Sequence, residues 1–366
     1  MTPQKLFSPT TINGLSLDNR IVMAPMTREF SPGGVPGEDV AGYYRRRAEG
    51  EVGLIVTEGT TINDSVASMS DRIPRFHGED ALNGWKHVVD EVHRAGGKIF
   101  PQLWHVGSAR NAKKSSNPDL PSASPSGFLV PGKQISEPMS VAHIEHIIAA
   151  FAEAAADTKR IGFDGVEFHG AHGYLIDQFF WEGLNQRKDS FGGNLAKRMQ
   201  FAIEIIKAAR SMVGPGYPIA LRYSQWKQQD YTAKLASSPS ELEQFLSPLV
   251  EAGVDCFHCS TRRYWEPEFE NSDLNLAGWT KKITGKPCIT VGSVGLDGDF
   301  MDAIATLESS ETRGLDDLID RLNKEEFEMV AVGRALLQDP LWAQKVRQGN
   351  IDEIHAYDGQ AVKSLS

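Results

Sequence analysis

Short apolar segments rich in β-branched residues recur along the chain, and longer amphipathic stretches separate them. Several of these segments lack the alternation of apolar and polar positions that a sheet with one solvated face shows. Continuous apolar character is typical of parallel strands that are covered on both faces. The pattern predicts eight strands, at residues 21–24, 53–58, 98–104, 165–169, 218–223, 254–259, 288–292 and 329–333.

Helical periodicity occupies most of the stretches between these strands. The predicted helices cover residues 40–50, 81–95, 141–162, 195–213, 240–252, 297–305 and 314–324. Regular alternation of strands and helices indicates an α/β protein with a parallel sheet. Eight such units in 366 residues predict a single-domain (β/α)₈ TIM barrel over residues 1–366.

Two additions to this barrel are expected. Asn13 and Gly14 form a turn signal within residues 11–17, which predicts a hairpin that caps the bottom of the barrel. Residues 107–138, after the third strand, are rich in Ser, Pro, Gly and Asn and are too long for an ordinary connection. They predict an inserted loop or small subdomain, either an active-site lid or a separate unit.

Composition and charge narrow the class of protein. Hydrophobic residues make up 40% of the chain and charged residues 23%, as in ordinary soluble proteins. The net charge of −10 disfavours binding to nucleic acid or to an anionic membrane. No apolar stretch is long enough to span a bilayer, so we expect a cytoplasmic enzyme whose partners are small molecules. The oligomeric state stays open, and a homo-oligomer is compatible with the sequence.

The three cysteines do not form a recognisable metal or redox site. Cys256 and Cys259 form a C-x-x-C pair, but the pair lies within a predicted strand, whereas a redox dithiol normally begins a helix. Cys288 alone cannot complete a structural zinc site or a four-thiolate iron–sulfur cluster. We therefore expect free thiols around a buried strand.

The segment from His169 to Tyr174 (H-G-A-H-G-Y) carries the clearest chemical signal. It follows the fourth predicted strand, and barrel enzymes place their chemistry at this end of the strands. Two imidazole donors beside a phenol suit a substrate that develops negative charge on an oxygen. A metal site formed by His169 and His172 is the alternative. The nearby Glu167 should point to the other face of the strand and no clear third ligand is present, so we expect no metal.

Other strand ends predict a cofactor. The turns at Gly292–Ser293 and Gly333–Arg334 follow the last two strands, where barrels frequently bind a phosphate. Gln102, Arg222 and Gly59 suit a flat polar heterocycle. Flavin mononucleotide fits better than a dinucleotide, because no strand–G-x-G-x-x-G–helix motif occurs. Two alternatives to ligand contact remain open. Arg222 can form a structural ion pair with Glu167, and Trp104 can be a core residue.

Several motifs, taken together and in order, resemble those of the Old Yellow Enzyme family of flavin-dependent ene-reductases. The resemblance covers nearly the whole chain. Its motifs lie at residues 19–28 (NRIVMAPMTR), 102–104 (QLW), 169–175 (HGAHGYL), 185–193 (N-x-R-x-D-x-F-G-G), Arg222 and 332–336 (VGRAL). The resemblance implies bound FMN, reduction by NADH or NADPH, and hydride transfer to an activated alkene.

The resemblance also implies a role for each matching residue. His169 and His172 match the pair that binds the carbonyl or nitro oxygen of the substrate, and Tyr174 matches the proton donor. Thr27 matches the residue that hydrogen-bonds the flavin ring and tunes its potential, and Trp104 matches a substrate-pocket position. Other flavin-contacting positions are Ala24, Pro25, Gly59, Gln102 and Arg222. Phosphate-end positions are Gly292, Ser293, Gly333 and Arg334.

Two other functions are compatible with the residues themselves. One is a non-redox barrel enzyme that acts on a phosphorylated substrate, and the other is a flavin-binding protein without turnover. The sequence names neither the alkene nor the preferred nicotinamide nucleotide. We expect the loops at residues 107–138 and 262–270 to shape the substrate pocket.

Overall fold

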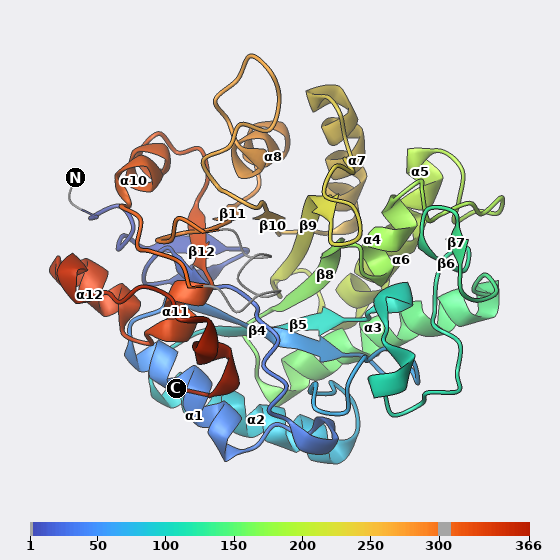
Figure 1. The fold of residues 1–366 in the computed structure, drawn as a ribbon, viewed down its shortest axis with the longest axis horizontal. Helices are drawn as coiled ribbons and strands as arrows, with labels where there is room; N and C mark the ends of the chain where they lie inside the picture. The colour runs from blue at the N-terminus through green and yellow to red at the C-terminus, as the bar shows by residue number, and fades with distance from the viewer. Residues whose placement is uncertain (1–2, 299–308) are drawn as a thin grey trace.

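The computed structural model describes residues 3–298 and 309–366, and its centre is a closed barrel of eight parallel strands (Figure 1). The strands follow one another around the barrel in chain order. They are β3 (Ile21–Met23), β4 (Leu54–Thr61), β5 (Ile99–Trp104), β8 (Val166–His172), β9 (Ile219–Lys227), β10 (Cys256–Ser260), β11 (Cys288–Val291) and β12 (Met329–Val332). The predicted (β/α)₈ barrel is confirmed.

Helices surround the strands on the outside of the barrel (Figure 1). They are α1 (Glu38–Glu49), α2 (Glu79–Arg94), α3 (Val141–Ile161), α4 (Leu175–Phe180), α5 (Leu195–Arg198), α6 (Gln200–Val213), α7 (Pro239–Ala252), α8 (Leu276–Thr284), α10 (Asp316–Asn323), α11 (Arg334–Gln338) and α12 (Trp342–Gln348). In the part of the chain that the structure describes, no helix combines the length and the apolar character needed to cross a membrane.

Helix α8 was not predicted from the sequence. The Asn275 side chain caps its first turn by accepting from the backbone N–H of Gly278, and Gly285 ends it with φ of 65°. The helix predicted at residues 297–305 lies mostly outside the described residues. The predicted helix at residues 195–213 is divided into α5 and α6, which meet at Met199.

Alternate residues of each strand point to opposite faces. One apolar core therefore lies between the strands and the surrounding helices, and a second lies inside the barrel. Phe168 of β8 points outward and packs edge-on against Phe151 of α3, with ring centroids 5.9 Å apart. A smaller apolar core fills the lower barrel interior. Its fully or almost fully buried members are Ile12, Leu17, Val22, Ala24, Leu54, Val56, Phe100, Ala220, Cys256, Ile289, Met329 and Ala331.

The predicted N-terminal hairpin is confirmed and closes the bottom of this interior. Strands β1 (Thr10–Ile12) and β2 (Leu15–Leu17) pair antiparallel across a two-residue turn. Both turn residues have positive φ, 44° at Asn13 and 83° at Gly14, as a type I′ turn requires. Ile12 and Leu17 then reach into the interior core from below.

The insertion after β5 forms a small subdomain beside the barrel. It contains the turns η2 (Gly107–Ala109) and η3 (Ala112–Lys114) and the hairpin of β6 (Phe128–Val130) and β7 (Lys133–Gln134). Arg187 attaches it to the barrel by donating to the carbonyl oxygens of Pro125 and Met139 at 2.7 and 2.6 Å. Residues 107–138, all of which are described, do not line the main cavity, contrary to the expectation that they shape the substrate pocket.

Candidate active site

A cavity opens at the carboxyl ends of the barrel strands. All the residues that the sequence analysis assigned to a site lie on its wall. They are Ala24, Pro25, Thr27, Gly59, Gln102, Trp104, His169, His172, Tyr174, Arg222, Gly292, Ser293, Gly333 and Arg334. The structure thus brings together residues from seven of the eight strand ends, whereas their individual roles remain predictions.

An irregularity in β8 places both histidines on the cavity. Residues three apart on a regular strand point to opposite faces. The pairing of β8 with β9 shifts between Gly170 and His172, and His172 adopts φ of 65°. Its backbone N–H donates to Ser224 Oγ at 3.0 Å, which holds the irregular conformation. His169 and His172 can therefore face the same ligand.

Aromatic rings pack closely around the two imidazoles. Trp104 lies nearly parallel to His169, with ring centroids 5.9 Å apart and 20° between the planes. Tyr174 meets His169 edge-on at 4.9 Å and Trp104 edge-on at 4.8 Å. Trp226 stacks on His172 at 4.6 Å. These contacts limit the rotation of each ring and shield one side of the site from water.

Burial sets the protonation states of the three polar rings. It holds the pKa of His169 and His172 well below the usual value, and the Arg222 cation lowers both further. Both rings are therefore neutral at physiological pH. The backbone N–H of Ala171 donates to His169 Nδ1 at 3.4 Å, which leaves Nε2 as the protonated nitrogen. Burial raises the pKa of the Tyr174 phenol, so Tyr174 keeps its proton.

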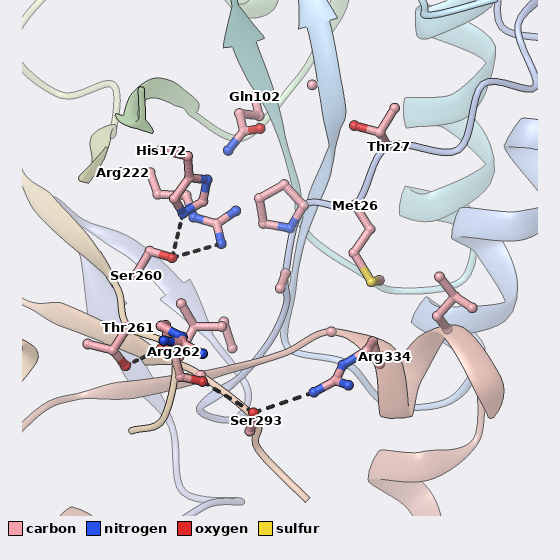
Figure 2. A pocket seen from close by; sticks show the side chains of 18 of the residues that line it. Met26, Thr27, Gln102, His172, Arg222, Ser260, Thr261, Arg262, Ser293 and Arg334 are labelled. Carbon is pink, nitrogen blue, oxygen red and sulfur yellow. Dashed lines mark hydrogen bonds between the residues drawn. The ribbon is translucent and has the colours of Figure 1, made fainter. Parts of the chain in front are cut away.

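Arg222 lies beside His172, and Ser260 connects the two (Figure 2). Ser260 Oγ is 2.8 Å from His172 Nε2 and accepts from Arg222 Nη2 at 3.4 Å. Arg222 Nε is buried and has no hydrogen-bond partner within the described chain. Burial lowers the pKa of Arg222 to about 10, so the guanidinium remains charged at neutral pH. A buried cationic donor without an acceptor indicates space for a ligand acceptor.

Glu167, the alternative partner of Arg222, forms hydrogen bonds with other residues. Glu167 accepts hydrogen bonds from Gln102 Nε2 at 2.8 Å and pairs with His258 Nδ1 at 2.7 Å. No hydrogen bond joins it to Arg222 among the residues that the structure describes. The same residues contain no group of three or more His, Cys, Asp or Glu side chains arranged to hold a metal ion.

Gly59 is required by a neighbouring side chain. A Cβ at this position would lie 2.4 Å from Cε3 of Trp104. Gly59 was predicted to suit a flat heterocycle, and the indole ring gives a further reason for a glycine at this position. Gly59 still lines the cavity, and Trp104, 2% exposed, forms both a buried wall and part of the cavity surface.

The predicted phosphate end has an unusual backbone. Gly292 and Ser293 have φ of 150° and 49°, and a Cβ on Gly292 would lie 2.7 Å from the Thr261 carbonyl oxygen. Arg334 donates to Ser310 Oγ at 2.9 Å, to the Gly298 carbonyl at 2.5 Å and to Ser293 Oγ at 3.4 Å. Figure 2 shows Arg334 and Ser293 along one side of the cavity. The guanidinium is thus held in place by the chain itself.

A buried carboxylate holds the loop that carries Thr27. Glu58 Oε2 accepts from the backbone N–H groups of Arg28 at 2.8 Å and Glu29 at 3.3 Å. Burial raises the pKa of Glu58 to about 7, although these hydrogen bonds oppose the rise. The loop after β3 therefore depends on a group that titrates near neutral pH.

Half of the residues on the cavity wall had no individual role predicted from the sequence. These are Met26, Arg28, Trp226, Gln228, Ser260, Thr261, Arg262, Val291, Val294, Leu296, Ala331, Leu337, Tyr357 and Val362. Ser260 ends β10, and its position at a strand end was the available signal. Tyr357 and Val362 come from the segment after α12 and carry no local signal. Arg262 confirms that the loop at residues 262–270 reaches the pocket.

Comparison with curated proteins finds relatives over much of the chain. An NADH oxidase of Thermoanaerobacter brockii is 35% identical over 360 residues, which is 95% of this chain and 52% of the relative. The 12-oxophytodienoate reductase 7 of Oryza sativa subsp. japonica is 38% identical over 57% of this chain and 56% of its own length. The chain thus spans about half the length of these two relatives.

Solved structures of similar shape include morphinone reductase in complex with tetrahydroNAD. It is 26% identical, with a TM-score of 0.79, and the match covers 94% of this chain and 90% of that one. The model of the NADH:flavin oxidoreductase / NADH oxidase family matches residues 5–313. The family's cofactor is FMN, and the predicted resemblance to the Old Yellow Enzyme family is confirmed. The chain therefore belongs to the NADH:flavin oxidoreductase / NADH oxidase family.

Proposed function

We propose that this protein uses FMN and NADH or NADPH to reduce the C=C bond of α,β-unsaturated carbonyl or nitro compounds. The observation that carries the proposal is the arrangement at the end of β8. Two neutral imidazoles and a protonated phenol face one cavity that also contains the predicted flavin positions. Reduction of an activated alkene needs donors for a developing oxyanion and a separate proton source.

The wall of the cavity fits FMN. Arg222 Nε lacks an acceptor, and the pyrimidine end of an isoalloxazine ring supplies acceptor atoms. Gln102 offers an amide on the same wall. Ser293 and Arg334 provide a hydroxyl and a fixed cation toward the phosphate end. When bound, reduced FMN supplies the hydride for the β-carbon of the alkene.

His169 and His172 act on the oxygen of the substrate. Neutral imidazole N–H groups stabilise the negative charge that accumulates on a carbonyl or nitro oxygen more than they stabilise the uncharged substrate. Packing against Trp104 and Trp226 holds the rings in place before the substrate binds. The site therefore needs little rearrangement when charge develops.

Tyr174 supplies the proton for the α-carbon. Gln228 Nε2 donates to its oxygen at 3.2 Å, so the phenol hydrogen stays available for donation. A raised pKa keeps this hydrogen in place at physiological pH. The names of the similar proteins, 12-oxophytodienoate reductase and morphinone reductase, support a reductase of organic substrates. The tetrahydroNAD in the morphinone reductase complex supports a nicotinamide donor.

The visible absorption spectrum of the purified protein tests the proposal. NADPH and then cyclohexenone are added under anaerobic conditions. We expect a flavin band that bleaches with NADPH and returns with the enone. If the band bleaches and stays bleached with every enone or nitroalkene, alkene reduction is overturned. If the protein cannot be loaded with FMN, the whole proposal is overturned, and the alternative is a non-redox enzyme that acts on a phosphorylated substrate.

A further inference from the structure

We propose that Glu167 is a positioning residue for the flavin site, which fixes the side-chain amide of Gln102 and balances the charge of Arg222. The inference rests on the proposed function, because it assumes that FMN lies against Gln102. Glu167 belongs to neither the histidine pair nor the cavity wall. It lies immediately below the cavity, inside the barrel.

The side chains of Gln102, Glu167 and His258 form one polar layer across the barrel interior. Gln102 of β5 and Glu167 of β8 are direct partners in the strand register. His258 enters from β10 on the other side of β9. Glu167 and His258 have no exposed surface, and Gln102 is 2% exposed. The smaller interior core lies next to this layer and shares Ala24 and Ala331 with the cavity wall.

The hydrogen bonds fix which atom of Gln102 faces the ligand. Burial alone raises the pKa of Glu167, but the hydrogen bonds from His258 and Gln102 and the Arg222 cation outweigh it, and the net pKa is lowered. The ionised carboxylate only accepts hydrogen bonds. Gln102 must therefore turn its Nε2 toward Glu167 Oε1, 2.8 Å away, and its Oε1 away from it. An amide held in this way presents its carbonyl oxygen to an N–H group of a heterocycle.

His258 keeps the carboxylate in place without adding charge. Burial lowers the pKa of His258, so the ring is neutral and donates from Nδ1 to Glu167 Oε2 at 2.7 Å. The layer and Arg222 together then have a net charge close to zero, because the negative carboxylate of Glu167 balances the positive guanidinium of Arg222. Loss of the carboxylate leaves a buried cation next to the flavin, and a cation there favours the electron-rich reduced cofactor.

Glu167→Gln tests the charge balance in the FMN-loaded protein. We expect the equilibrium between oxidised and reduced flavin to shift about tenfold toward the reduced form. For a two-electron couple this shift makes the midpoint potential ~30 mV more positive. An unchanged potential in a variant that still binds FMN overturns the charge-balancing role. A wild-type protein that binds no FMN instead defeats the proposed function, so the two failures are distinguishable.

Glu167→Asp tests positioning separately, because it keeps the charge and shortens the side chain by one methylene. We expect a potential near that of the wild type but FMN binding weaker by about five- to tenfold, as expected for one lost hydrogen bond. In a Gln102→Leu background the same substitution should change FMN affinity less than twofold, because the positioned amide is absent. Equal effects in both backgrounds overturn action through Gln102. If Glu167→Gln does not fold, the aspartate variant still decides the positioning role.

Discussion

The indole of Trp226 stacks on the imidazole of His172, with ring centroids 4.6 Å apart and 26° between the planes. The same imidazole is held in its own plane by Ser260 Oγ, 2.8 Å from Nε2. One contact limits tilting of the ring and the other limits its rotation. His172 is therefore oriented before any substrate arrives, although its backbone lies in the left-handed region at φ of 65°.

Ser260→Ala should weaken binding of phenols, which imitate an enolate, by about five- to tenfold. The variant removes the in-plane partner of His172 Nε2, and one buried hydrogen bond contributes about 1 kcal/mol. Titration of the flavin spectrum with a phenol measures the dissociation constant. Ser260→Thr keeps a hydroxyl and is the matched control, with affinity near that of the wild type. Equal weakening in both variants would contradict the role of the hydroxyl.

Tyr174→Phe should leave reduction of the flavin by NADPH within about twofold of the wild type. Reoxidation by an enone should slow by about 10²- to 10⁴-fold, because general acid catalysis typically contributes this much. Stopped-flow absorbance measures the two half-reactions separately. Gln228→Leu keeps the phenol and removes only its hydrogen-bond donor, so it should slow reoxidation much less. Equal slowing of both half-reactions in the Tyr174 variant would rule out a specific proton donor.

The combined His169→Ala and His172→Ala substitutions should leave FMN bound and weaken enone and phenol binding by about a hundredfold, because two hydrogen bonds to the ligand oxygen are lost. Because the pKa of both rings lies well below the usual value, both stay neutral when the pH falls from 8 to 6. Enone affinity of the wild type should therefore be constant over this range. The measurements are flavin content and ligand titration at several pH values. Loss of FMN in the double variant would show that the pair is structural.

Sequence reasoning found the barrel and the positions of the site because both follow from simple geometry. Parallel strands buried on both faces appear as apolar runs, and their carboxyl ends meet at one opening of the barrel. Residues near the carboxyl ends of these runs, such as Gln102, His169 and Arg222, must therefore lie near one another. Helix α8 was missed because its nine residues include Trp, two Thr and a Lys pair, and only Asn275 and Gly285 mark its ends.

Other parts of the site depend on the three-dimensional register of the strands. Ser260 reaches His172 only because β10 and the irregular end of β8 both flank β9. Tyr357 reaches the cavity through an antiparallel bridge with Ser310, and no local pattern indicates this contact. The contact by which Trp104 requires a glycine at position 59 also depends on this register, because the indole lies on the neighbouring strand.

The stability of the protein should depend on pH through Glu58. The folded pKa is raised from 4.5 to about 7, so between these values the folded state holds a proton that the unfolded state has lost. The unfolding free energy therefore falls as the pH rises through this window. The shift corresponds to a loss of roughly 3 kcal/mol that is complete above pH 7. Glu58→Gln removes the titration and keeps an acceptor for the Arg28 backbone N–H.

Denaturant unfolding of the wild type and Glu58→Gln, both saturated with FMN, measures this difference at pH 5, 6, 7 and 8. We expect the variant to gain stability relative to the wild type as the pH rises, because only the wild type must ionise a buried carboxyl group. Comparing the two proteins at each pH cancels the contribution of Glu268, whose pKa burial also raises to about 7. Parallel stability curves would mean that Glu58 is ionised throughout, held by the backbone N–H groups of the Thr27 loop.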